Sequence, residues 1–502
     1  MRDPAPWQKR YHRLLLLALT FGLFSQYMFV GHDAGISVLL VVGGFYGLLF
    51  YGVKGRIGGL DQWRGQTRSG WLLFVPISLL AISYAVFAGE LFRALNAVIL
   101  PLMLLSQAVL LTRSSKQPWY RPGFYEDVIH LGFIKPLTYM TVPFSLVSEW
   151  IAAKEGESSG RGSLRKISLG LVIASPVLVV VISLLASADS IFQSMLQSIP
   201  DLAGGLHAGE FVVRLLAALL IATYAFCYIW GLLFREPAAG SAFPSTVAGS
   251  PTTSGRPSLR LDPITAATLF ISVNVVYLLF AAVQFTYLFG AADGLLPDGE
   301  AYAAYARKGF IELVLVAVIN LALLLIGLHG VRREGKTVQL VIKTTLALIV
   351  GCTVVMLVSA YSRLALYEEA YGYTLTRLLV HGFMLFLAVL LVIAIVRVWW
   401  SRFSLAKAYI CAAVIAYVLM NYANLDARIA ANNAERYEAT GIIDLDYLAT
   451  RSADATPALA DLAARYPELE QARAILADMR QEASRDRAWQ SWNWSKWRAA
   501  ES

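Results

Sequence analysis

Residues 376–397 read TRLLVHGFMLFLAVLLVIAIVR, and this stretch decides the fold class. Between Arg377 and Arg397 it contains no Asp, Glu, Lys or Arg. An α-helix rises about 1.5 Å per residue, so about 20 apolar residues cross the hydrocarbon core of a bilayer, which is about 30 Å thick. The stretch therefore predicts a membrane-spanning helix.

Similar apolar blocks recur along the chain. Of its 502 residues, 57% are hydrophobic and 15% are charged, and the mean hydropathy is +0.58. A soluble protein has roughly 25% charged residues, so the bilayer is the predicted solvent for most of this chain. The blocks predict an all-α, polytopic transmembrane helical bundle of about eleven spans: 14–30, 34–53, 70–88, 92–111, 167–187, 211–234, 264–289, 309–330, 338–358, 376–397 and 405–423.

The distribution of positive charge predicts the orientation in the membrane. With the N-terminus in the cytoplasm, 26 of the 42 Lys and Arg residues lie in or beside cytoplasmic segments, 6 beside the short outer loops and 10 in the C-terminal tail. Cytoplasmic loops are enriched in Lys and Arg, so the N-terminus is predicted inside and the tail outside. This pattern explains the net charge of +8, and no basic face with interleaved aromatics indicates a nucleic-acid partner.

The spans group into two membrane halves and a tail. The predicted division is an N-terminal half of six spans (1–235), a flexible cytoplasmic linker (236–262), a C-terminal half of five spans (263–423) and a small extracytoplasmic helical tail (424–502). The linker is rich in Ser, Gly, Pro and Thr, a composition that cannot bury a core.

The segment 112–166, which is predicted to be cytoplasmic, contains an apolar stretch that does not have the pattern of a membrane span. Within residues 123–150, Lys135, Pro136 and Pro143 interrupt the apolar pattern. If the stretch crossed the membrane, every later loop would change sides and the charge count would fail. We therefore expect interfacial or re-entrant helices on the cytoplasmic side.

Motifs that carry chemistry are scarce. The six histidines lie at no metal-ligand spacing from one another, and the three cysteines fall within apolar blocks. Gly156-Glu-Ser158-Ser-Gly160 matches the nucleophile-elbow pattern, but it lies in a polar loop and not between a strand and a helix. The sequence predicts no catalytic residue, no metal site and no cofactor. Gly43 and Gly47 form a G-x-x-x-G in the second span, which predicts close helix packing there.

Polar and aromatic residues gather at the predicted outer ends of the spans. Glu312 lies about one turn inside its span and is costly in lipid without a partner, which Arg307, Arg363 or Arg377 could supply. Such a cluster either binds a ligand or locks helices together, and Tyr belongs at membrane interfaces in any case. Its members are Asp189, Gln284, Tyr287, Tyr302, Tyr305, Arg307, Glu312, Arg363, Tyr367, Tyr371, Arg377, Asn424 and Asp426.

The tail carries two features that bear on where it lies. Ile442, Ile443, Leu445, Tyr447 and Leu448 give an apolar surface that some 80 residues can scarcely bury alone. Four tryptophans between 489 and 497 favour a membrane interface. We expect the tail to dock on the membrane body at loops 290–309 and 359–377. The alternative is an independent helical domain with a Trp-rich anchor.

Three stretches resemble a known family. They are YLFGAADGLLPDGEAYAAYARKGF (287–310), SRLALYEEAYGYTLTRL (362–378) and NLDARIAANNAERYEATGIIDLDYLATRSADATPAL (424–459). Together with Ser187-Ala-Asp189 they look like bacterial membrane proteins grouped as domain of unknown function 4173, or the related 4153. The resemblance implies a multi-span protein of the bacterial cytoplasmic membrane, and it carries over no functional residues.

Three classes of function fit these observations. The favoured one is a non-enzymatic envelope sensor, scaffold or assembly factor that binds a partner protein or an amphiphile at its outer face. A transporter of a lipid or amphiphile is the first alternative, although the mid-span polar residues are the amides Asn274 and Asn320 and not ionisable groups. A membrane glycosyltransferase with a lipid-linked donor is the second, although its first outer loop would be only Gly31-His32-Asp33-Ala34.

Overall fold

A computed structural model describes residues 6–54, 66–153, 208–234, 262–290, 310–329, 331, 335–400, 404–485 and 488–501. All regular secondary structure in these ranges is helical, and they contain no β-strand. The predicted all-α fold class is therefore confirmed. Eight helices in the described ranges are long and apolar enough to cross a membrane, as a polytopic helical bundle requires.

These eight helices overlap eight of the eleven predicted spans. Of the other three, 14–30 overlaps α1 (Pro6–Phe29), and 309–330 overlaps α14 (Phe310–His329), in which the apolar part Glu312–Leu328 is shorter than a typical span. The span at 167–187 falls outside the described residues. The number eleven thus stays a prediction.

The described residues fall into two compact units, and each is treated by itself. The first unit is drawn from Met1–Val86, Arg93–Ser241 and Arg485–Trp494, and the second from Phe87–Phe92, Ala242–Ser484 and Ser495–Ser502.

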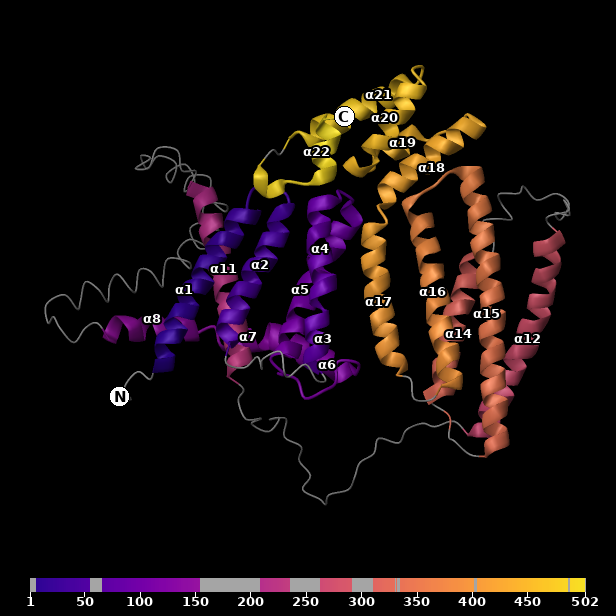
Figure 1. The fold of residues 1–502 in the computed structure, drawn as a ribbon, viewed down its shortest axis with the longest axis horizontal. Coiled ribbons are helices and arrows are strands. Elements are labelled where there is room, and N and C mark those ends of the chain that lie inside the picture. The colour runs from indigo at the N-terminus through magenta and orange to yellow at the C-terminus, as the bar shows by residue number, and fades with distance from the viewer. Residues whose placement is uncertain are drawn as a thin grey trace, which may run out of the picture. The chain divides into compact units, whose positions relative to one another are not determined.

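The first unit is built on long apolar helices. Its helices are α1, α2 (Ile36–Val53), α3 (Gln66–Leu72), α4 (Phe74–Val86), α5 (Glu90–Leu111) and α11 (Ala208–Leu233). α1 packs along α11 and α2, and α2 packs against α4 (Figure 1). The core includes Leu14, Phe226 and Tyr228, all fully buried.

Small residues bring α1 and α11 close together. A Cβ atom added to Gly22 would collide with the backbone of Ala218 and the side chain of Ala222, so the two helices approach at van der Waals distance there. Gly43 and Gly47 face open space instead. The prediction of close packing at this G-x-x-x-G is wrong for the described part of the chain, because the motif faces no neighbouring helix.

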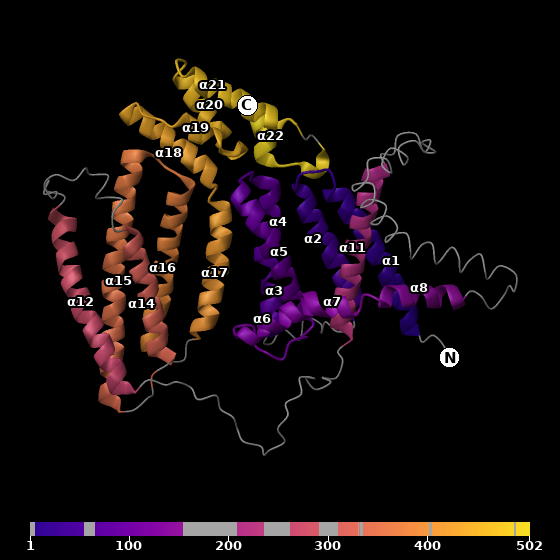
Figure 2. The ribbon, with the colours of Figure 1, turned by 180° about the vertical axis from the view of Figure 1, so that it is seen from behind.

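Short helices occupy the segment after α5. They are α6 (Pro122–Ile129), the π-helix η2 (His130–Ile134), α7 (Lys135–Thr138) and α8 (Val142–Ala153). Each is far shorter than the about 20 residues that a span needs. α8 runs across the direction of α1 in both ribbon views (Figures 1 and 2). An interfacial or re-entrant placement of this segment stays a prediction.

The second unit contains the later long helices and most of the tail. Its long helices are α12 (Pro263–Gly290), α14, α15 (Lys336–Tyr371), α16 (Leu375–Trp399) and α17 (Leu405–Tyr422), and its tail helices are α18 (Leu425–Thr440), α19 (Leu445–Ala449), η5 (Ala453–Ala455), α20 (Thr456–Arg465) and α21 (Glu470–Ala483). α15 packs against α12, α14 and α16. With 36 residues it is about 54 Å long, well beyond the hydrocarbon core.

The two mid-span amides join α12, α14 and α15. Asn274 donates to the carbonyl of Thr345 at 2.9 Å, and Asn320 donates to the hydroxyl of Thr353 at 2.8 Å. Tyr277 donates to the other end of the Asn320 amide. Polar groups that bond across helices in this way hold a bundle in register. Both amides are therefore used inside the bundle.

The tail helices have a core of their own within the second unit. Ile429, Leu448, Leu459 and Leu462 are fully or almost fully buried among them. The last two helices are η6 (Trp489–Ser491) and α22 (Trp494–Glu501). Residues of η6 and its surroundings belong to the first unit, where the Ile36 amide donates to the Trp492 carbonyl at 3.0 Å and Asn493 donates to the Tyr84 carbonyl at 2.8 Å.

Candidate functional site

The predicted polar cluster is only partly within the described residues. Asp189, Tyr302, Tyr305 and Arg307 lie outside them. Gln284 and Tyr287 fall on α12, at positions whose side chains are not described. The remaining members all belong to the second unit: Glu312, Arg363, Tyr367, Tyr371, Arg377, Asn424 and Asp426.

The turn between α15 and α16 brings three of these residues together. Gly372 ends α15 with a positive φ of 84°, which glycine adopts without strain. Arg377 reaches back from α16 and donates to the Gly372 carbonyl. Its guanidinium lies over the Tyr367 ring, 4.3 Å from the centroid, and the Tyr367 and Tyr371 rings are 4.8 Å apart. Arg377 thus stabilises the turn through a hydrogen bond and a cation–π contact.

Of the three partners suggested for Glu312, only Arg363 and Arg377 lie within the described residues, and Arg307 lies outside them. Glu312 is exposed on α14, and no ion pair joins it to Arg363 or Arg377 in the described part of the chain. Arg377 instead contacts the α15–α16 turn through the Gly372 carbonyl and the Tyr367 ring.

A different carboxylate is buried near this end of the unit. Glu368 is 3% exposed, and its Oε2 lies 3.4 Å from Nδ1 of His381 on α16. The His381 ring stacks on Tyr361, with centroids 4.3 Å apart. Oε1 of Glu368 has no hydrogen-bond partner among the described residues. A buried acid–imidazole pair in a membrane protein is a recognised candidate for a functional site.

Sequence reasoning missed both Glu368 and His381, although a signal is present. Tyr361, Leu364 and Glu368 recur at i, i+3 and i+7, which places them on one face of a helix. That pattern was hidden because the ninth span was predicted to end at 358. The structure corrects this boundary, since α15 continues to Tyr371.

Tail helix α18 is seated on the same turn by hydrogen bonds to the backbone. The Asn433 amide accepts from the Tyr373 N–H at 3.0 Å and donates to the Tyr373 carbonyl at 2.9 Å. Arg436 donates to the carbonyls of Glu369 and Ala370 at 2.8 and 2.6 Å. The Tyr447 hydroxyl accepts from the Leu375 N–H at 2.8 Å. The described part of the tail therefore contacts the segment 359–377, where docking was expected.

The fit at this contact is close. A Cβ atom on Gly372 would lie 2.7 Å from Oδ1 of Asn433, which is shorter than a van der Waals contact. Gly372 is thus needed twice, for its positive φ and for the approach of the Asn433 amide. Burial raises the pKa of the neighbouring Tyr373, and the nearby carboxylates of Glu368, Glu369 and Glu435 act in the same direction.

Two buried carboxylates of the tail make further contacts within the second unit. Asp426 is 3.4 Å from Arg451 and accepts from the Ser452 N–H at 3.2 Å. Asp454 accepts from the N–H groups of Ala88 and Gly89, both at 3.0 Å, and these belong to the segment Phe87–Phe92 of the second unit. Burial is the main reason that the pKa of Asp454 is raised, while its hydrogen bonds to backbone N–H groups oppose the shift.

Asn424 has a local task. It adopts a left-handed conformation with φ 47° between α17 and α18, and its side chain accepts from the Ala427 N–H as the N-cap of α18. Asn tolerates this conformation better than most residues. Asn424 and Asp426 thus bond within the tail, whereas Asn433 and Arg436 bond to the α15–α16 turn. Whether the predicted cluster binds a ligand or locks helices together stays a prediction.

Long apolar helices with a tail seated on their ends define a polytopic helical membrane protein. A family comparison agrees with this class, since the sequence profile of a domain of unknown function, DUF4153, matches residues 74–462. The chain belongs to this family, which is the related group named from the sequence, whereas the resemblance to 4173 stays a prediction. No curated protein and no solved structure matches the chain significantly.

Proposed function

We propose that this chain is a non-enzymatic integral protein of the bacterial cytoplasmic membrane, acting as a sensor, scaffold or assembly factor. In this proposal it binds an envelope protein or an amphiphile at its extracytoplasmic face. The observation that carries the proposal is the set of hydrogen bonds that seats α18 on the α15–α16 turn. These bonds join the tail and two membrane helices into one platform.

An exposed surface lies beside these bonds. Tyr371 is 56% exposed and Ile442 is 63% exposed. Arg436 connects them, because its guanidinium donates to the carbonyls of both Ala370 and Ile442. Aromatic and aliphatic side chains next to fixed polar groups are typical anchors at protein interfaces. This surface supports binding of an apolar partner at the platform.

The same seating provides a route for signalling. Asn433 and Arg436 hold the backbone of the α15–α16 turn and not flexible side chains, so a partner that shifts α18 also bears on that turn. α15 extends from the turn for about 54 Å. A rigid helix of this length can carry a displacement from one side of a membrane to the other.

Site-specific photocrosslinking tests the proposal. A photoreactive amino acid is placed at Ile442 in the full-length chain in its native membranes, and a matched one at Glu482, which is exposed on α21. We expect a discrete protein or lipid adduct at position 442 and none at 482. Asn433→Ala together with Arg436→Ala should abolish the adduct, because both anchors of the platform are then removed.

Two results would contradict the proposed function. One is the same pattern of adducts from positions 442 and 482, which indicates random collisions. The other is an adduct at 442 that persists unchanged in the double variant, because the partner would then not depend on the seated tail.

One observation favours a second candidate, transport of a lipid or amphiphile coupled to protons. Buried ionisable pairs such as Glu368 and His381 mark proton pathways in many pumps and transporters. Vesicles that carry the reconstituted chain would then take up protons under an applied pH gradient, whereas vesicles with Glu368→Gln would not. Equal uptake by both proteins excludes this candidate.

A further inference from the structure

A cavity in the first unit lies where three segments meet. Its volume is about 180 Å³, and it is lined by residues 112–114, which directly follow α5, by Leu131 of η2 and Lys135 of α7, and by Gly231 and Leu232 of α11. Liquid water occupies about 30 Å³ per molecule, so the space suits a phosphate group with some waters. This end of α5 is the one that the charge pattern predicts to be cytoplasmic.

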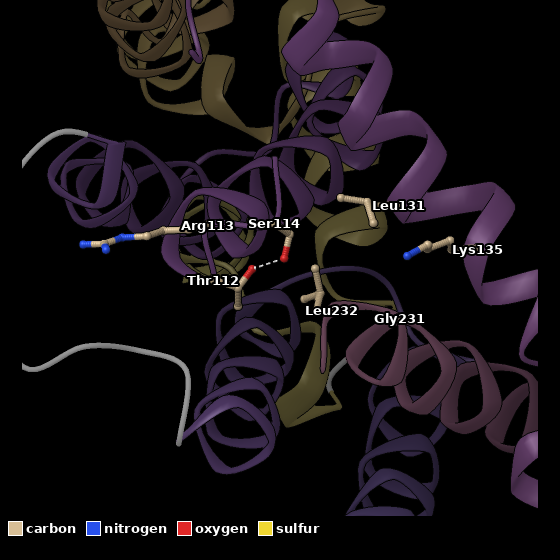
Figure 3. Close-up of a pocket in the computed structure, with 7 residues that line it drawn as sticks. All are labelled: Thr112, Arg113, Ser114, Leu131, Lys135, Gly231 and Leu232. Carbon is tan, nitrogen blue, oxygen red and sulfur yellow. Dashed lines mark hydrogen bonds between the residues drawn. The ribbon is translucent and has the colours of Figure 1, made fainter. Parts of the chain in front are cut away.

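The polar groups of the cavity suit an anion. Figure 3 shows the Lys135 side chain directed toward the side where Thr112 and Ser114 lie, whereas the Arg113 guanidinium points away. The two hydroxyls are 2.7 Å apart. Because the Thr112 hydroxyl donates to the Ala108 carbonyl at 2.7 Å, the hydrogen between the two hydroxyls belongs to Ser114. Ser114 can therefore turn this hydrogen to a ligand oxygen.

Two irregular backbone features border the same cavity. The π-helix η2 (His130–Ile134) directly precedes Lys135 and contributes Leu131 to the lining. Arg113 has a positive φ of 52°, one of only two such non-glycine residues in the described part of the chain. π-Helical turns and left-handed non-glycine residues cost energy and concentrate at functional sites. Here both occur at one cavity.

The segment that supplies Lys135 also exposes a row of apolar side chains. Five of them are between 46% and 66% exposed: Ile129, Phe133, Ile134, Leu137 and Met140. Such a row next to a cation is typical of a segment that lies in the headgroup region of a membrane. A ligand for this place thus has an anionic head and an apolar body.

We propose that the cavity binds the phosphate group of an anionic membrane lipid. Lys135 pairs with the phosphate, the Ser114 hydroxyl donates to one of its oxygens, and the acyl chains lie along the row Ile129–Met140. Basic pockets between membrane helices on the cytoplasmic side are suited to anionic headgroups. A soluble phosphate ester shares the head but not the apolar body.

Native mass spectrometry of the full-length chain in detergent tests the proposal. The probes are phosphatidylglycerol, a diacylglycerol with the same acyl chains, and inorganic phosphate. Lys135→Gln should weaken phosphatidylglycerol binding about tenfold or more, since a hydrogen bond to a charged group contributes about that much to affinity. Lys135→Arg should retain binding within about threefold, because it keeps the charge. Lys116→Gln, an exposed charge outside the lining, should have no effect.

The outcomes separate the proposal from its alternatives. Equal loss in Lys135→Gln and Lys116→Gln would overturn it, because general surface charge would then explain the binding. If diacylglycerol binds as tightly as phosphatidylglycerol, the phosphate does not contribute to binding, and the proposal is overturned. Inorganic phosphate that displaces the lipid at a similar concentration, and binds Lys135→Gln about tenfold more weakly, would overturn the lipid as the source of the phosphate.

Discussion

Polar residues of the second unit serve two purposes. Asn433 and Arg436 bond to the backbone of the α15–α16 turn, so their polar atoms replace water with protein partners. Glu368 and Asp454 keep a carboxylate out of water, which is costly for the charged form. The first pair holds the tail, whereas the second pair places carboxyl groups where the charged form is disfavoured.

The raised pKa of Asp454 predicts a pH dependence of stability. Because the folded carboxyl binds a proton more readily than the unfolded one, its contribution to stability is present at low pH and is lost as the pH rises through the folded-state pKa. Asp454→Asn is neutral at every pH. In thermal unfolding of the purified chain, the melting temperature of this variant relative to wild type should therefore increase as the pH rises from about 4.

A matched variant isolates this effect. Asp478 is exposed on α21, so Asp478→Asn removes a charge from the tail without relieving any burial. Its melting temperature relative to wild type should not vary with pH in the same range. If Asp454→Asn shows a difference from wild type that is constant with pH, Asp454 does not titrate as its burial implies.

Sequence patterns indicate some residues of the candidate site but miss those that come together only through helix packing. Arg377 and Tyr367 stand out as charged or aromatic residues at a span end, and they do contact one another. Glu368 and His381 come from different helices, and only the packing of α15 against α16 brings them together. Hydropathy along one chain shows that a polar residue is unusual, but not which neighbour it meets.

At the level of helices, a short stretch of sequence predicts where a helix forms, whereas it does not predict which neighbour that helix packs against. The apolar runs predict where helices form, since burial in lipid depends on a local stretch of sequence. The end of α15 could not be found in this way, because Arg363, Glu368 and Glu369 end the apolar run while the helix continues. Likewise Gly22 and not Gly43 marks the close crossing, because spacing alone does not show which face has a neighbour.

The contact of α18 with the α15–α16 turn predicts the effect of removing one amide. Asn433→Ala loses both hydrogen bonds to Tyr373, and leaving the partly buried N–H and C=O of Tyr373 unpaired costs roughly 1–3 kcal/mol. We expect limited trypsin digestion in detergent to cut between Arg451 and Arg480 faster than in wild type, while the membrane helices stay folded.

The neighbouring amide provides the control. Asn432→Ala changes the same side-chain type one position earlier, on a part of α18 that makes neither of the bonds to Tyr373. It should be cut at the wild-type rate. Similar rates for Asn433→Ala and wild type would show that these bonds do not hold the tail.

The whole molecule is a multi-pass membrane protein, and its proposed role depends on orientation. The tail must lie outside for an envelope partner to reach Ile442. The cavity around Lys135 must lie on the cytoplasmic side of the membrane, where the basic loops also lie. Both placements rest on the asymmetry of 26 positive residues beside inner segments against 6 beside short outer loops.

A pair of reporter fusions tests this orientation most directly. One reporter is active only in the cytoplasm and the other only outside it, and each is fused after Gly240 and, separately, at the C-terminus. The predicted result is that the cytoplasmic reporter works only after Gly240 and the external reporter only at the C-terminus. Both sites reporting the same compartment, or the reverse pattern, would contradict an extracytoplasmic tail.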